Sequence, residues 1–242
     1  APSSSGTAGS RWVYFAKGGA AGTDVAATLA NKEISFKTNA GALDGVPIGS
    51  AGEFLKVNSG ATGYEFGAVS SDFVRLGTVT SGFANTIAVD FFTSTYEIYK
   101  VFVEGVRISN AGAGYGIRFN SSAGTAVSGS YYRHVFTGGY RNNSGTNNSA
   151  QSTSAWDADV MLLSNGSPNS YEMGNHEITV YLPMESDTRT RCIVTGGGFD
   201  ANHIYSRHGH GVYTTAEAHT GLTFLATAGT IAIDHIEVYG LK

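Results

Sequence analysis

Short apolar runs alternate with turn residues along most of this chain. From residue 73 onward, ten runs rich in Val, Ile, Tyr and Phe are separated by Ser, Gly and Asn. This texture is typical of β-strands joined by turns, and no long segment carries apolar residues at helical spacing. We therefore expect strands and no long helix in this region, at residues 73–80, 86–90, 96–108, 116–119, 131–136, 158–163, 177–182, 191–195, 221–225 and 231–239.

The longest run, residues 96–108, predicts a strand with apolar side chains on both faces. A strand of this kind belongs at the centre of a sandwich or beneath a subunit contact, since a solvated face is usually polar. Strict alternation places Tyr96, Ile98, Phe102, Val106 and Ile108 on one side and Tyr99, Val101 and Val103 on the other. The expected fold class is all-β, with an antiparallel β-sandwich of jelly-roll type over residues 72–242.

The front of the chain differs in texture. Residues 1–45 are small, polar and rich in Gly and Ala, with short strand-like runs at residues 11–15 and 33–37 and a possible short helix at residues 23–30. Too few large apolar side chains are present to offset the entropy of ordering this backbone. We expect an extended arm that docks on a partner, and the alternative is an unstructured terminus. The docking anchors would be Trp12, Tyr14 and Phe15.

Residues 46–71 are expected to form a short β connector. Two apolar runs flank a turn-rich stretch at residues 58–63, which predicts a hairpin. A two-stranded hairpin of this size is marginal in water unless it packs against another surface. We expect a neighbouring subunit to supply that surface and to contact Phe54, Leu55, Val57, Tyr64 and Phe66.

Residues 138–155 interrupt the strand pattern with a run dominated by Asn, Ser and Gly, which predicts a long polar loop. Amides and a guanidinium bond sugar hydroxyls, and an aromatic face packs on the C–H surface of a pyranose. A polar loop without any ligand is the alternative. The candidate glycan-binding residues are Tyr140, Arg141, Asn142, Asn147 and Trp156.

The charge balance excludes several partners. The 242 residues include 15 basic and 19 acidic side chains, for a net charge of -4, which is not the footprint of a general nucleic-acid-binding protein. No apolar run of membrane-spanning length occurs, and the first residues lack the features of a secretion signal. We expect neither nucleic acid nor membrane insertion among the partners.

The sequence contains none of the catalytic or phosphate-binding motifs that we sought. Cys192 lies in an apolar run and is expected to be a small buried hydrophobe. The side chains of Asp200, His203, His208 and His210 are of the types that bind zinc or nickel, although scattered histidines usually serve at the surface. We expect no enzymatic activity, no cofactor and no metal, and we interpret residues 196–198, three glycines, as a bulge or turn.

Two patterns resemble segments of tailed-phage fibre and virion-surface proteins. Residues 51–67, Ala-Gly-Glu-Phe-Leu-Lys-Val-Asn-Ser-Gly-Ala-Thr-Gly-Tyr-Glu-Phe-Gly, resemble a connector that precedes the distal domains of those proteins. Glu53 stands where Gln is usual, and Phe66 stands where Trp is usual. Residues 237–241, Glu-Val-Tyr-Gly-Leu, are similar to the closing strand of phage-fibre sandwich domains.

This resemblance implies a homotrimeric connector within a non-enzymatic virion structural protein. We expect a short fibre or spike on the virion surface, anchored by its arm to capsid or tail proteins and attached to host-surface glycan through its sandwich. One alternative is a capsid decoration protein, or head fibre, that stabilises the shell. Another is a polysaccharide-degrading tailspike, which would need a pair of carboxylates such as Asp157 with Asp159 or Glu172 with Glu177.

Overall fold

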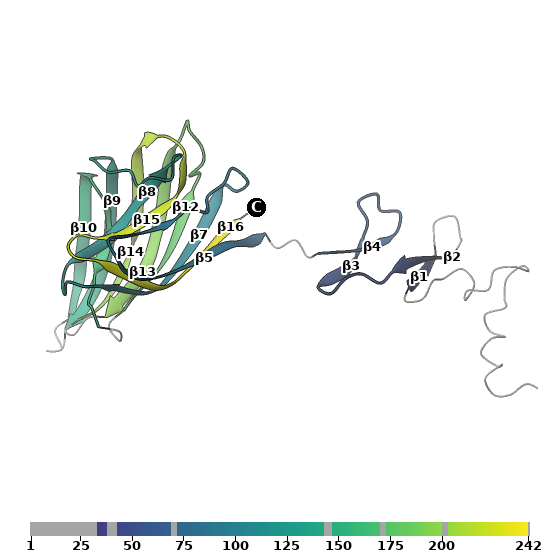
Figure 1. Cartoon of the computed structure of the whole chain (residues 1–242), viewed down its shortest axis with the longest axis horizontal. Coiled ribbons are helices and arrows are strands. Elements are labelled where there is room, and N and C mark those ends of the chain that lie inside the picture. Colours follow the sequence, from purple (N-terminus) through teal and green to yellow (C-terminus); the bar gives the residue numbers. More distant parts are fainter. Residues whose placement is uncertain are drawn as a thin grey trace, which may run out of the picture. The chain divides into compact units, whose positions relative to one another are not determined.

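The computed structural model describes residues 33–37, 43–68, 72–142, 147–169, 173–199 and 203–241. All of the regular secondary structure among these residues is β-strand, so the all-β prediction is confirmed. The chain divides into two units, Ala1–Ser71 and Asp72–Lys242, and most of their strands are labelled in Figure 1. None of the described segments is a helix with the length and apolarity that a membrane crossing requires.

The first unit contains two antiparallel hairpins. Strand β1 (Glu33–Lys37) pairs with β2 (Leu43–Pro47), and β3 (Glu53–Val57) pairs with β4 (Tyr64–Ala68). The predicted strand at residues 33–37 and the predicted hairpin of the connector are confirmed. Trp12, Tyr14 and Phe15, together with the possible helix at residues 23–30, lie outside the described residues.

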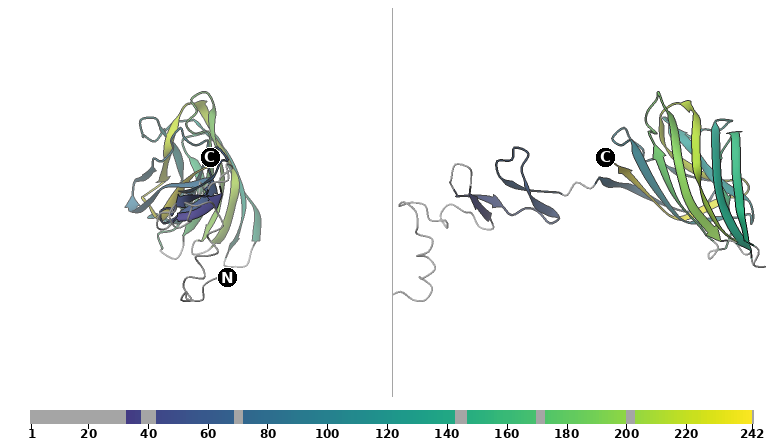
Figure 2. Two further views of the ribbon diagram at one scale, coloured as in Figure 1. Left: turned by 90° about the vertical axis from the view of Figure 1, so that its right-hand side faces the viewer. Right: turned by 180° about the vertical axis from the view of Figure 1, so that it is seen from behind.

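The second unit is an antiparallel β-sandwich, as predicted, with an eight-stranded and a four-stranded sheet (Figure 2). In order across the sheet, the larger one contains β10 (Asn147–Ala158), β9 (Tyr132–Asn142), β14 (His203–Ala216), β13 (Arg189–Phe199), β12 (Gly174–Tyr181), β7 (Ile98–Ile108), β16 (Ile231–Leu241) and β5 (Phe73–Ala84). The smaller one contains β11 (Met161–Asn165), β8 (Gly114–Ser121), β15 (His219–Ala226) and β6 (Thr86–Val89).

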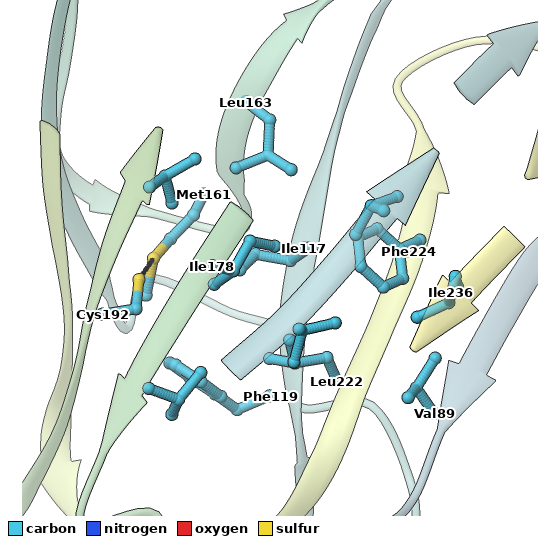
Figure 3. Close-up of a cluster of buried hydrophobic side chains, with 14 of the residues drawn as sticks. Val89, Ile117, Phe119, Met161, Leu163, Ile178, Cys192, Leu222, Phe224 and Ile236 are labelled. Atoms are coloured by element: carbon cyan, nitrogen blue, oxygen red, sulfur yellow. Dashed lines mark hydrogen bonds between the residues drawn. The ribbon is translucent and has the colours of Figure 1, made fainter. Parts of the chain in front are cut away.

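Aliphatic and aromatic side chains fill the space between the two sheets (Figure 3). Phe119 and Leu222 from the smaller sheet and Ile178 from the larger sheet have no exposed surface. Fully burying one such side chain contributes about 1.5–3 kcal/mol to stability. Cys192 is part of this core, with its Sγ atom 3.6 Å from Sδ of Met161, so the prediction of a buried small hydrophobe is confirmed. Burial raises the pKa of its thiol to about 12, which keeps the sulfur protonated.

The face assignment in β7 is wrong beyond Gly105. Tyr99 and Val103 point into the core, but Val106 and Ile108 are buried on the same side rather than opposite. Gly105 has a φ of 71°, and the register between β7 and β12 shifts beside it. A bulge of this kind adds one residue to the strand and reverses the alternation that follows.

The predicted loop at residues 138–155 is also wrong, since β9 and β10 continue through most of it and pair as a hairpin. Ser and Thr are tolerated there because β10 is the last strand of its sheet. The predicted bulge at Gly196–Gly198 is wrong as well, because these residues pair in regular register with β12 and β14. A Cβ atom at Gly196 would lie 2.1 Å from Nδ1 of His176, so only glycine leaves room for that ring.

Candidate functional sites

The β3–β4 hairpin exposes large apolar side chains on one face. The register places Leu55 opposite Phe66 and Val57 opposite Tyr64, so these four side chains share a face. Leu55 is 43% exposed and Val57 is 58% exposed. We call this surface, formed by Leu55, Val57, Tyr64 and Phe66, the connector face. Among the first-unit side chains whose burial the structure describes, Val46 is the one apolar side chain that is buried.

The opposite face of the hairpin is more polar. Nζ of Lys56 lies 3.3 Å from Oε1 of Glu65, and these two residues pair across the strands. Phe54 belongs to this side and is 61% exposed. The structure therefore brings together four of the five predicted connector residues and separates Phe54 from them.

Side-chain hydrogen bonds fix the turn between β3 and β4. Oδ1 of Asn58 accepts a hydrogen bond from the backbone N–H of Thr62 at 2.9 Å, and the Asn58 amide donates to the Thr62 hydroxyl at 3.1 Å. Ala61 between them has a φ of 51°. Before the hairpin, Oε2 of Glu53 accepts a hydrogen bond from the backbone N–H of Ser50 at 2.6 Å. A Gln side chain offers the same acceptor, which explains why Glu53 is compatible with the motif.

The predicted glycan-binding residues fall at two places on the β9–β10 hairpin. Arg141 pairs with Asn147 near the tip, and Tyr140 and Asn142 flank Arg141 on β9. Trp156 follows Ala155, which pairs with His134, seven residues before Arg141 along β9. Seven residues of strand span about 23 Å. The hairpin thus groups the tip residues and separates them from Trp156.

A hollow of about 630 Å³ lies in the larger sheet near that second place, and we call it the outer pocket. Four strands, β9, β10, β13 and β14, contribute to it. It is lined by Arg133, His134, Val135, Ala155, Arg191, His210, Gly211 and Val212.

Strand register explains why basic groups meet in the outer pocket. Val212 pairs with both Arg133 and Arg191, and His210 pairs with Val135. The chain neighbours Tyr132, Phe136 and Cys192 point into the core. The side chains that point away from the core are therefore those of Arg133, Val135, Arg191, His210 and Val212. His208 and His210 are two residues apart on β14, and their ring centroids lie 6.3 Å apart. Sequence reasoning missed Arg133 and Arg191.

Elsewhere on the outward side of the larger sheet, charged side chains are paired with each other. Lys100 of β7 contacts Glu177 of β12, and Nε of Arg75 lies 3.5 Å from Oε1 of Glu237. The Tyr239 hydroxyl donates a hydrogen bond to Glu237 at 2.8 Å, which lowers the pKa of that carboxyl.

Three histidines are buried on the core side. Nε2 of His176 lies 2.6 Å from the Tyr115 hydroxyl, and burial, assisted by the positive charge of Arg207, lowers the His176 pKa to about 4. Burial also lowers the pKa of His219 to about 4, although Glu217 opposes that shift. His134 beneath the outer pocket stacks on Phe136, and its pKa is lowered by burial. All three rings are therefore neutral at pH 7.

No group of three or more potential metal ligands comes together within the part of the chain that the structure describes. Asp200 of the candidate histidine cluster lies outside it. Comparison with known proteins gives no family for this chain: no family model, no curated protein and no solved structure matches it.

Proposed function

We propose that this chain is a non-enzymatic structural subunit of a tailed-phage virion, a short homotrimeric fibre or spike whose sandwich attaches to host-surface glycan. The connector face carries this proposal. Leu55 and Val57 are large apolar side chains about half exposed on a two-stranded hairpin, and no second layer buries them within the part of the chain that the structure describes. Copies of the same hairpin offer a matching apolar surface.

The energetics favour assembly through this face. Removing a Val or Leu side chain from water contributes about 1.5–3 kcal/mol when burial is complete. A side chain that is half exposed in the single chain still has apolar surface to bury when subunits associate. Part of this free energy is therefore available for association, and each of the three copies contributes it. The ordered turn at Asn58 and Thr62 presents the face without further ordering cost.

The resemblance to phage connectors gives the virion context. The Asn, Ala and Thr positions of the resembling segment are the ones that hold the turn, and Glu53 keeps the hydrogen bond that the usual Gln would make. The pairing of β5 and β7 with β16, and of β6 and β8 with β15, supports the jelly-roll interpretation, because the first strands of the unit fold back along the last.

Sedimentation of the purified full-length chain tests the trimer. One chain has a mass of 25.2 kDa, so three copies give about 76 kDa. A Leu55→Ser, Val57→Ser double variant should sediment as a monomer at concentrations where the native chain is trimeric. Lys56→Ser, on the opposite face of the same strand, is the matched control and should stay trimeric. A native chain that is monomeric at high concentration would overturn the proposal.

Immunogold labelling of intact virions tests the location. Label at the tail or at surface spikes supports a fibre, whereas uniform label over the head supports the decoration alternative. Deleting residues 1–45 should leave a folded chain that no longer joins the particle, if those residues are the attachment arm. Incorporation of the deleted chain at normal occupancy would contradict that role.

A further inference from the structure

The larger sheet of the sandwich carries four apolar side chains in one cross-strand row, at the end where β5 begins. Leu241 of β16 pairs with Phe73 of β5 on one side and with Ile98 of β7 on the other. Ile98 pairs in turn with Tyr181 of β12. These strands are neighbours in the sheet, so the four side chains are contiguous. We call them the apolar row.

The apolar row faces away from the core of the sandwich. Tyr99 and Val180 are fully buried in the core. They are the chain neighbours of Ile98 and Tyr181, which therefore point to the opposite side of the sheet. Residues that pair directly across strands share a face, so the whole row points outward.

Each side chain of the row keeps part of its surface exposed, and Phe73 is 36% exposed. The Phe73 ring also lies 4.9 Å from the Tyr239 ring, centroid to centroid, which extends the apolar surface to the next row. The solvated face of an antiparallel sheet is usually polar. A contiguous apolar patch on such a face is typical of an interaction surface.

The charges beside the row are paired within the protein. Two residues along β7 from Ile98, Lys100 contacts Glu177 of β12. Two residues along β5 from Phe73, Nε of Arg75 lies 3.5 Å from Oε1 of Glu237. A paired charge costs less to remove from water than an isolated one, so a partner surface can cover this part of the sheet.

The length of the chain indicates which partner that is. Ala68, the last residue of β4, and Phe73, the first of β5, are five residues apart. Five extended residues span at most about 18 Å. Once three connector faces associate, three copies of the apolar row are tethered to one assembly at a high effective concentration. Four side chains form less surface than a stable complex needs, so the row suits a tethered copy better than a free protein.

We propose that the apolar row is a second contact between copies of this chain, in which each sandwich packs its row against a neighbouring sandwich around the threefold axis. This inference rests on the proposed function, since association of the connector faces supplies the neighbouring copies. It assigns the β5 end of the larger sheet to the interior of the trimer.

Hydroxyl-radical footprinting with mass spectrometry tests whether the row is covered. The samples are the native full-length chain and the Leu55→Ser, Val57→Ser variant. In a native trimer, Phe73 and Tyr181 should be oxidised at least about threefold more slowly than in the monomeric variant, because the centre of an interface excludes water.

Phe83 is the matched control for Phe73 in this experiment. It has the same ring, is 48% exposed and lies ten residues further along β5, about 30 Å away. Its oxidation rate should be the same in the trimer and in the monomer. Equal oxidation of Phe73 in a native trimer and in a monomeric variant would overturn the proposal.

Matched variants locate the contact. Ile98→Thr combined with Leu241→Thr should raise the concentration at which the trimer dissociates by about tenfold or more, because two apolar side chains leave the interface. Val135→Thr makes the same kind of change on β9, four strands from β7 and about 19 Å away. Val135 is 49% exposed, and its change should shift the dissociation by less than about twofold. Equal shifts for the two changes would overturn the site, and circular dichroism melting shows whether each variant keeps its fold.

Sedimentation of the same samples separates this inference from the proposed function. A native trimer in which Phe73 is oxidised as fast as in the monomeric variant overturns the second contact and leaves the trimeric spike standing. A connector variant that stays trimeric until Ile98 and Leu241 are also changed supports the apolar row and overturns the connector face. A native chain that is monomeric overturns both.

Discussion

The two units of this chain use the same apolar residue types in opposite ways. In the sandwich, Phe119 and Leu222 have no exposed surface, whereas in the connector hairpin Phe54 is 61% and Leu55 is 43% exposed. The difference arises because the two sheets of the sandwich pack against each other and bury their apolar faces. The two-stranded connector hairpin is too small to bury its own apolar face. The sandwich therefore has the core of an independently folding unit, while the connector exposes the apolar surface that we propose is buried on assembly.

Lowering the pH should produce the largest difference in stability between the two units. All seven histidines lie after residue 72, and burial holds the pKa of His176 and His219 at about 4, below the ordinary value near 6.5. The unfolded chain therefore binds protons first as the pH falls. The stability from the two neutral rings is complete above about pH 6.5 and is lost towards pH 4, on the order of 3 kcal/mol for each ring.

Urea unfolding of the sandwich at pH 7, 5.5 and 4.5 measures this loss. His176→Gln should flatten the pH dependence, although it also removes the hydrogen bond to Tyr115. Equal stability at pH 7 and pH 4.5 would refute the argument.

Truncating one core side chain should have the next largest effect. Phe119→Ala removes a fully buried ring that lies 5.0 Å from the His219 ring, centroid to centroid, and it should cost about 3–5 kcal/mol. Thermal melting and urea unfolding measure the loss. The comparison of the two units predicts that Leu55→Ala in the connector costs the sandwich nothing. Equal destabilisation by both changes would contradict the independence of the sandwich.

A single added methyl group should distinguish two glycines within the sandwich. In Gly196→Ala the new Cβ atom meets Nδ1 of His176 at 2.1 Å and the carbonyl oxygen of Asn175 at 2.4 Å, so we expect a loss of about 1–3 kcal/mol. Gly82→Ala is the control, because a Cβ atom there has no neighbour within 4 Å. The control should be neutral or slightly stabilising. A neutral Gly196→Ala in the same melting experiment would mean that the His176 ring has room to move.

The ion pair on the polar side of the connector should have the smallest effect. Lys56 and Glu65 have half-exposed side chains, and exposed pairs of this kind contribute less than about 0.5 kcal/mol. Lys56→Ala should change neither the melting temperature of the sandwich nor the mass seen in sedimentation. A dissociated trimer in this variant would place the contact surface on the Lys56 side instead of the connector face.

Apolar alternation predicted most of the sandwich, and its failures have physical reasons. Strand β14 was missed because glycines occupy core-side positions: a Cβ atom at Gly211 would lie 2.2 Å from Sδ of Met161, and one at Gly209 would lie 2.5 Å from Cδ1 of Phe136. Large side chains from other strands fill that space, so β14 itself carries little apolar signal. The bulge in β7 did have a local signal, namely Gly105 within an apolar run.

The two candidate sites differed in how far sequence could predict them. The connector hairpin is local: its turn residues Asn58 and Thr62 are four positions apart, and the motif itself contains them. The outer pocket arises from register across four strands that join Arg133, Arg191 and His210. No local pattern links residues so far apart in the chain, because their proximity depends on which strands become neighbours.

The pairing of the first and last strands of the sandwich has a consequence for protein engineering. Phe73 of β5 lies directly opposite Leu241 of β16. A short peptide would therefore join these ends, and the backbone could be reopened between β9 and β10 to give a circular permutant with the same sheets. Such a permutant would carry its chain ends between β9 and β10, where a reporter domain could be fused.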